Sequence, residues 1–130
     1  MILTSLQLLI GVFFSILFLQ SGLDKIVNFN GNRSYIASVF EKTFLKSSST
    51  LLFIGITLLE TAAGLLSAIG SAYYVFTGES MLLLLGLQSS ALSLLCLFLG
   101  QRIAKDYAGA AGLVAYFLLA AFGISLFIGR

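Results

Sequence analysis

Long uncharged runs separated by short polar segments organise this sequence. No charged residue occurs from 1 to 23, and the runs 51–76, 81–100 and 107–129 contain a single charge, Glu60. A helix needs roughly 20 mostly apolar residues to cross the hydrocarbon core of a bilayer, and each run is about that long. The pattern predicts four transmembrane helices in a single integral membrane domain, residues 1–130.

Small and weakly polar residues recur at intervals of three and four along each predicted helix, so they share one face of it. Membrane helices associate through close contacts at such residues, because lipid tails are as apolar as leucine. The expected contact faces are Thr4, Gln7, Gly11, Ser15 and Gly22; Thr57, Glu60, Gly64, Ser67 and Ser71; Gly86, Ser89, Ser93, Cys96 and Gly100; and Gly109, Gly112, Tyr116, Ala120 and Gly123. The predicted fold is an all-α membrane protein, a compact antiparallel bundle of four transmembrane helices.

The polar segment between the first two spans contains a further amphipathic pattern. Its aromatic and aliphatic residues fall on one side of a helix predicted over 34–46: Tyr35, Ile36, Val39, Phe40 and Phe44. Such a helix lies in the membrane interface, with its lysines near anionic lipid. Asn30 and Gly31 are expected to form the turn ahead of it, because both tolerate positive φ.

The distribution of lysine and arginine predicts the orientation of the chain. Four of these residues follow span one and two follow span three, whereas the opposite side has only Arg130. Basic loops near spans stay on the cytoplasmic side. We therefore expect a multi-pass protein with both termini outside and the loops 24–50 and 101–106 in the cytoplasm.

Composition supports a membrane protein and excludes several functions. Charged residues make up 9% of the chain, whereas a soluble domain carries about 25%. The net charge of +2, without a basic run interleaved with aromatics, argues against nucleic-acid binding. Because the chain has no histidine and one cysteine, Cys96, it is not expected to hold a metal by itself.

Glu60 is the residue of the spans that most needs an explanation, because an acid at mid-span costs about 2.5–3.5 kcal/mol on insertion scales. Counting from Leu51 places it about 15 Å deep, near the midplane. Four residues predicted at similar depth are its candidate hydrogen-bond partners: Ser15, Gln88, Ser89 and Tyr116. Burial without a cation would favour the protonated form. Glu60 then either lines a pocket for a quinone, a small molecule or a proton path, or only links helices.

A second group of charges lies at the predicted cytoplasmic rim. It comprises Asp24 and Lys25 at the end of span one, and Arg102, Lys105 and Asp106 ahead of span four. Opposite charges there would form a partly buried network that locks the helix ends, or a polar mouth leading toward Glu60. We favour the lock, because charges at span ends are common and often only extend toward the headgroups.

Three short motifs resemble a known family. They are Ser21-Gly22-Leu23-Asp24-Lys25-Ile26 closing the first span, Glu60 ahead of Gly64, and Lys105-Asp106-Tyr107-Ala108-Gly109 opening the last span. Together with length, span count and order, they resemble the DoxX-like family of small four-helix bacterial inner-membrane proteins. The family is named after a subunit of a thiosulfate:quinone oxidoreductase, and other members act in oxidative-stress complexes or membrane-protein assembly. The resemblance implies that Gly22, Lys25, Glu60 and Gly109 are the positions of interest.

The leading hypothesis is a non-catalytic subunit or scaffold of a membrane redox or assembly complex in the bacterial inner membrane. The chain would bind no cofactor alone, although its polar interior near Glu60 would accept a quinone or another lipid-soluble ligand. A protein partner or a second copy would complete the complex. The alternative is a small proton-coupled transporter of the four-helix multidrug type that uses Glu60 as its proton-binding carboxylate. A third role is lipid packing or assembly, with Glu60 only joining helices.

Overall fold

A computed structural model describes residues 1–128 as an all-α protein with four long helices. These are α1 (Ile2–Val27), α3 (Ser49–Thr77), α4 (Met81–Ile103) and α5 (Tyr107–Ser125). A shorter helix, α2 (Phe29–Val39), and a 3-10 turn, η1 (Lys46–Ser48), lie between α1 and α3. Each long helix, α3 together with η1, is long and apolar enough to cross a membrane. The prediction of an all-α, multi-pass membrane protein is therefore confirmed. The predicted end of span four at Gly129, and Arg130, lie outside the described residues.

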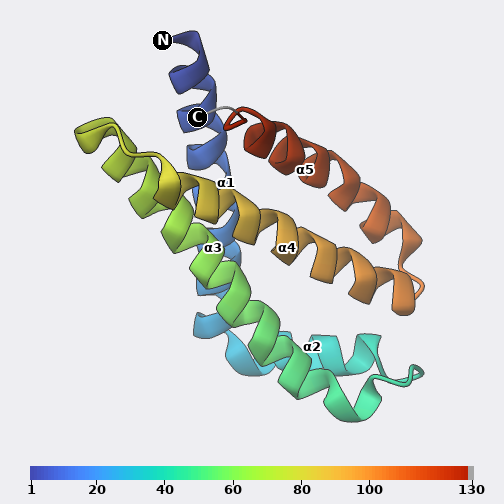
Figure 1. Cartoon of the computed structure of the whole chain (residues 1–130). Helices are drawn as coiled ribbons and strands as arrows, with labels where there is room; N and C mark the ends of the chain where they lie inside the picture. Colours follow the sequence, from blue (N-terminus) through green and yellow to red (C-terminus); the bar gives the residue numbers. More distant parts are fainter. Residues whose placement is uncertain (129–130) are drawn as a thin grey trace.

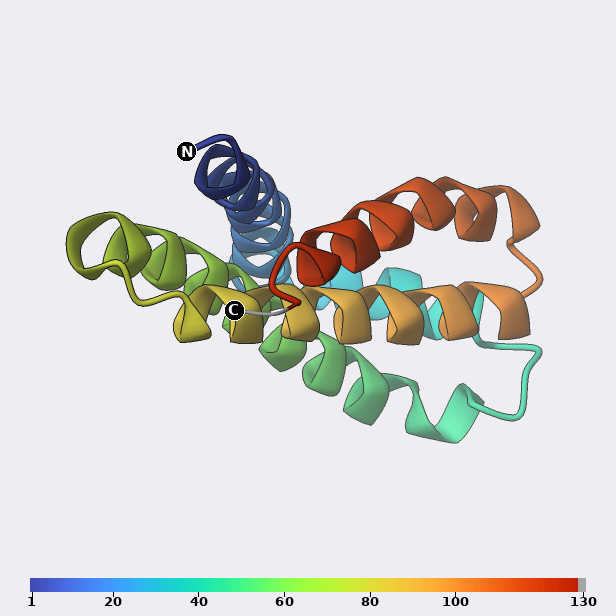
Figure 2. The same ribbon diagram turned by 45° about the horizontal axis from the view of Figure 1, so that its top comes forward.

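The long helices alternate in direction and form an antiparallel bundle. The start of α1, the turn between α3 and α4 and the end of α5 lie at one end, and α2 and the α4–α5 connection lie at the other (Figure 1). In the second view α4 and α5 run side by side, and α1 crosses them steeply (Figure 2). The helix that α1 mainly packs on is α3. We call the end with α2 the basic end, because it holds both basic loops.

Glycines bring the helix backbones of α1, α3 and α4 close together. A Cβ at Gly64 would lie 2.7 Å from the backbone nitrogen of Leu19, and one at Gly86 would lie 2.6 Å from that of Ser67. Close contacts of this kind hold membrane helices together, because the hydrophobic effect does not drive helix association inside lipid. Large side chains fill the remaining core: Phe14, Phe18, Leu83, Leu87 and Leu94.

The predicted contact faces are correct for two helices and partly wrong for the others. All five predicted residues of α3 are buried, and in α1 only Thr4 is not fully buried. In α4 the face is rotated, since Ser90 is buried while Ser89 is half-buried and Cys96 is exposed. In α5 only Ala120 and Gly123 of the predicted set are buried. Both of these helices are apolar all round, so sequence periodicity does not fix which side faces the bundle.

The helix between the first two spans begins and ends earlier than predicted. It covers 29–39 rather than 34–46, and Asn30 and Gly31 lie inside it instead of forming a turn. The Asn32 amide donates to the backbone oxygen of Asn28 at 2.9 Å, which supports the first turn. The helix stops before Phe40, which is buried beside Gly100 of α4, where a Cβ would lie 3.5 Å from the Phe40 ring.

A buried glutamine joins three elements at the end opposite α2. Gln7, 1% exposed, donates to the backbone oxygen of Leu126 at 3.0 Å and accepts from the Tyr74 hydroxyl at 2.7 Å. The amide thus ties α1 to α3 and to the residues after α5.

Tyr74→Phe is expected to destabilise the protein by about 1 kcal/mol, because it leaves the buried Gln7 carbonyl oxygen without its donor. Unfolding of the purified protein in a mild detergent, with a denaturant gradient, measures this. Tyr73→Phe is the matched control, since Tyr73 is the exposed neighbour in sequence. Equal stability of the two variants would contradict the assignment.

Candidate functional site

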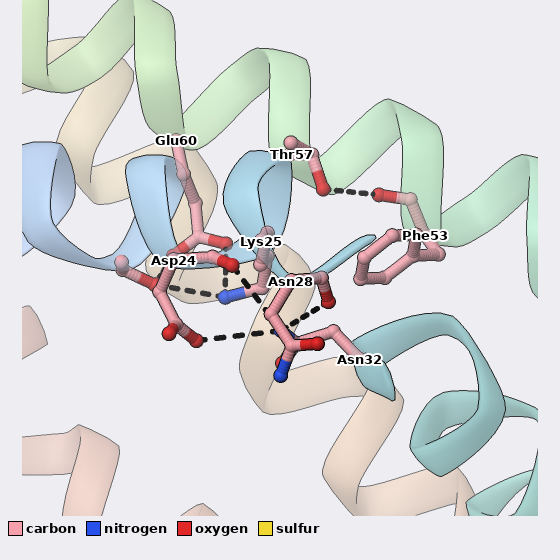
Figure 3. Close-up of polar contacts among 8 residues, drawn as sticks. Asp24, Lys25, Asn28, Asn32, Phe53, Thr57 and Glu60 are labelled. Carbon is pink, nitrogen blue, oxygen red and sulfur yellow. Dashed lines mark hydrogen bonds and ion pairs between the residues drawn. The ribbon is translucent and has the colours of Figure 1, made fainter. Parts of the chain in front are cut away.

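Glu60 lies between α3 and α1, where it forms an ion pair with Lys25. Lys25 Nζ is 3.0 Å from Glu60 Oε1, and the two side chains are 18% and 2% exposed, respectively. Figure 3 shows both side chains pointing toward one another across the helix contact. The contact has the length of an ion pair but not the angles of a hydrogen bond. Within residues 1–128 it is the only ion pair.

Ser21 completes a three-residue cluster with Glu60 and Lys25. Its hydroxyl donates to Glu60 Oε2 at 2.6 Å and accepts from Lys25 Nζ at 2.8 Å. Ser21 and Lys25 are four residues apart on α1, so they lie on one face of that helix. Both carboxylate oxygens of Glu60 thus have a polar neighbour on α1. We call these three residues the Glu60 cluster.

The local packing positions the Glu60 cluster. A Cβ at Gly22 would lie 2.5 Å from Thr61 Oγ1, so α1 and α3 come close together beside Glu60. Gly22 lies five residues before the last residue of α1, or about 7 Å along the helix axis. Glu60 is therefore near the basic end of α1, not at its middle. Only its level relative to α1 differs from the expectation, because α3 begins well beyond the end of α1; along α3, Glu60 lies eleven residues after Ser49, close to the predicted count.

The structure does not bring together the partners predicted for Glu60. Ser15 donates to the backbone oxygen of Gly11, and Tyr116 lies against the ring of Phe13, 6.0 Å between centroids. Gln88 is exposed and Ser89 half-buried. Because Ser67 lies opposite Gly86, Glu60, two turns earlier on α3, is level with the region of Ser93 rather than with Gln88 or Ser89.

The predicted rim network is not formed between α1 and the start of α5. Asp24 accepts from the Asn32 amide at 3.4 Å, and Asp106 instead caps α5 by accepting from the backbone N–H of Gly109 at 3.0 Å. The Arg102 guanidinium carbon lies 4.4 Å from the centre of the Tyr107 ring, a cation–π contact. Lys25 is engaged by Glu60, which is nearer to it because α1 packs on α3 rather than on α5.

Ser21 is the member of the Glu60 cluster that sequence reasoning did not assign. It belongs to the motif that carries the family resemblance, and its four-residue spacing from Lys25 was the available signal. Pairing of Lys25 with Glu60 was also missed, since the two were placed at different depths. Chemically, the cluster is a neutralised carboxylate held by a hydroxyl and an ammonium group on a neighbouring helix.

An apolar cavity lies elsewhere, between α2, the first half of α3 and the second half of α4. It has a volume of about 420 Å³ and we call it the apolar cavity. Aliphatic and aromatic side chains dominate its wall, including Ile36, Phe40, Phe53, Leu59 and Leu97. Polar residues at its wall are few, namely Tyr35, Gln101 and Asp106. Glu60 does not line it, although Leu59 beside it does. Size and lining suit a hydrocarbon chain.

The fold and these features define a class, an all-α multi-pass membrane protein with a buried ion pair and a lateral apolar cavity. No protein-family model matches the chain, and no curated protein or solved structure matches it. The likeness to the DoxX-like proteins therefore stays a prediction that depends on the sequence motifs.

Proposed function

We propose that this chain is a non-catalytic subunit or scaffold of a bacterial inner-membrane complex, as the DoxX-like motifs predict. The observation that carries the proposal is the engagement of Glu60 by Ser21 and Lys25. A carboxylate already paired with a cation joins helices and holds the bundle in one arrangement. Breaking such a buried pair is costly, so Glu60 is suited to support a fixed surface for a partner.

The same geometry counts against the proton-coupled transporter. A carboxylate that carries protons across a membrane has to exchange with water from each side, whereas Glu60 is 2% exposed and paired with Lys25. Protonation of Glu60 would also leave the Lys25 ammonium without its counter-charge. Transport by Glu60 is therefore the alternative that the experiment below is designed to detect.

The apolar cavity is the proposed site for a lipid-soluble ligand, a role first predicted for the surroundings of Glu60. Its volume of about 420 Å³ and its position beside α2 would allow entry from the bilayer. A quinone is one such ligand. Because the chain has no histidine and one cysteine, a partner would have to supply any redox centre.

We also propose that both termini face outside and that the basic end faces the cytoplasm. This orientation is supported by the fold, in which α2 and the α4–α5 connection lie at the same end of the bundle (Figure 1). Lys42 and Lys46 follow α2, and Arg102 and Lys105 lie in the last turn of α4 and in the connection after it. Positive residues close to spans remain on the cytoplasmic side during insertion.

Purification of the native complex, with efflux measured in parallel, tests the proposed function. We expect the tagged chain to co-purify at fixed stoichiometry with a protein that carries a redox cofactor or assists membrane-protein assembly, and to give no proton-driven efflux. Glu60→Gln is expected to weaken that association, and Glu79→Gln, in the exposed turn at the opposite end, is the matched control.

Efflux that is present in the wild type and lost in Glu60→Gln, at equal amounts of folded protein, would overturn the proposal in favour of transport. Purification of the chain alone, with no fixed partner, would overturn it as well. Lys25→Arg keeps the ion pair, so it serves as the second variant if Glu60→Gln fails to fold.

A further inference from the structure

A second, more polar cavity opens beside the apolar cavity at the basic end. It has a volume of about 610 Å³ and is formed by the segment after α2 and the turn between α4 and α5. Val39 and Ile103 line both cavities, so the two adjoin. We call the second one the basic cavity. A molecule that fills both would have a hydrocarbon part and a polar head.

The charges of the basic cavity favour an anion. Lys42 and Lys105 both line it, against one carboxylate, Glu41. The basic cavity by itself therefore carries one net positive charge, while Asp106, at the wall of the adjoining apolar cavity, accepts from the Gly109 N–H at the start of α5. Hydroxyl groups of Ser38 and Thr43 add polar atoms to the wall. A phosphate diester, with one negative charge and several acceptor oxygens, is complementary to this lining.

Lys105 occupies an unusual backbone conformation at this place. Its φ is 64°, and no other non-glycine residue among those described has a positive φ. It follows the last turn of α4, where the Asp106 N–H bonds to the Gln101 oxygen at 2.8 Å. This is the helix end that normally takes glycine. The fold thus presents a lysine at the mouth of the basic cavity where a residue without a side chain would be less strained.

We propose that the two cavities together bind an anionic phospholipid, with one acyl chain in the apolar cavity and the phosphate between Lys42 and Lys105. Basic pockets beside membrane helices on the cytoplasmic side are suited to anionic headgroups. This inference builds on the proposed function, because it names the ligand class of the lipid-soluble site. A neutral quinone head would leave the second lysine of the basic cavity without a counter-charge, since Glu41 offsets only one, and a zwitterionic head would bring its own cation beside the lysines.

Lipid binding to the full-length protein, purified in detergent, tests the inference. The probes are phosphatidylglycerol, phosphatidylcholine and phosphatidylethanolamine of identical acyl chains, with binding followed by native mass spectrometry and by the rise in unfolding temperature. Phosphatidylglycerol is expected to bind saturably and to raise the unfolding temperature most. The double variant Lys42→Gln with Lys105→Asn is expected to weaken its binding about 30-fold, from the usual contribution of each basic residue at an anionic membrane surface.

Matched variants separate the site from general electrostatics. Asparagine tolerates the positive φ at Lys105, and Arg33→Gln removes an exposed charge outside both cavities, so Arg33→Gln should bind phosphatidylglycerol as the wild type does. Gly55→Leu projects into the apolar cavity, and its Cβ meets nothing within 4 Å, so it should block the chain without disturbing the fold. Gly112→Leu is its control, since that Cβ also meets nothing within 4 Å.

Equal binding of phosphatidylcholine or phosphatidylethanolamine would overturn the inference, the latter pointing to Glu41 as the headgroup ligand. Equal losses in the lysine double variant and Arg33→Gln, or unchanged binding in Gly55→Leu, would overturn it too. Failure of lipid binding with an intact partner complex would contradict this inference alone. Loss of the partner with intact lipid binding would contradict the proposed function alone.

Discussion

Lys25→Met is expected to destabilise the protein by about 3 kcal/mol, because it leaves the Glu60 carboxylate buried without a counter-charge. The expected loss of stability is at the lower end of the range for broken buried pairs, since the Ser21 hydroxyl still donates to Glu60 Oε2 in this variant. Glu60→Gln should cost less, because the freed Lys25 is 18% exposed and can extend toward water. Denaturant unfolding in detergent measures both changes.

A double-mutant cycle gives the sharper result. Lys25→Met combined with Glu60→Gln should be more stable than Lys25→Met alone, since glutamine is neutral and its oxygen still accepts from Ser21. Lys46→Met is the matched control, because Lys46 is an exposed lysine at the same end and forms no ion pair with any residue of 1–128. If Lys25→Met unfolds like Lys46→Met, the ion pair contributes nothing and the structural role of Glu60 is lost with it.

Gly70→Ala is the second substitution with a large expected effect. A Cβ at Gly70 would lie 2.5 Å from the backbone nitrogen of Leu83 and 2.6 Å from its Cα. The clash is with the backbone of α4, so no side-chain rotation relieves it and the two helices must separate. We expect a loss of about 3 kcal/mol, at the upper end of the range for overpacking.

Gly55→Ala and Gly112→Ala are the controls for that prediction, because a Cβ at either position meets nothing within 4 Å. Alanine is the better helix former by about 1 kcal/mol, so these variants should be as stable as the wild type or slightly more stable. The same unfolding assay compares all three. A Gly70→Ala protein as stable as its two controls would show that α3 and α4 are not in close contact there.

The contact faces illustrate how far sequence reasoning reaches in a membrane protein. On α3, polar and small residues recur at helical spacing among large apolar ones, and the face they predict is the buried one. On α4, leucines surround the whole helix, and the prediction selected Ser89 and Cys96 where Ser90 and Leu94 are buried. Polar and small residues mark the inner face only where they are confined to one side of the helix, whereas on α4 the consecutive residues Gln88, Ser89 and Ser90 point in different directions.

The candidate site was predicted in part. Glu60 was identified correctly as the residue that needs a partner, since an acid inside a span is costly wherever the helix packs. Its partner, Lys25, was not identified, because the depth of each residue was counted from the end of its uncharged run. That count assumes helices of equal length and aligned ends, whereas α3 begins beyond the end of α1 and pairs Glu60 with Lys25.

By itself, the sequence determined that the chain crosses a membrane four times as helices, because hydrocarbon admits no charged or unpaired backbone groups and the uncharged runs have the required length. It also singled out Glu60. Only the tertiary structure decided that Lys25 and Ser21 neutralise that carboxylate, that α5 packs on α4 rather than α1, and where the cavities lie. These three features depend on how far the helices are offset along one another and on the angles at which they cross. Close contacts at glycines determine both, for example at Gly22, Gly64 and Gly70.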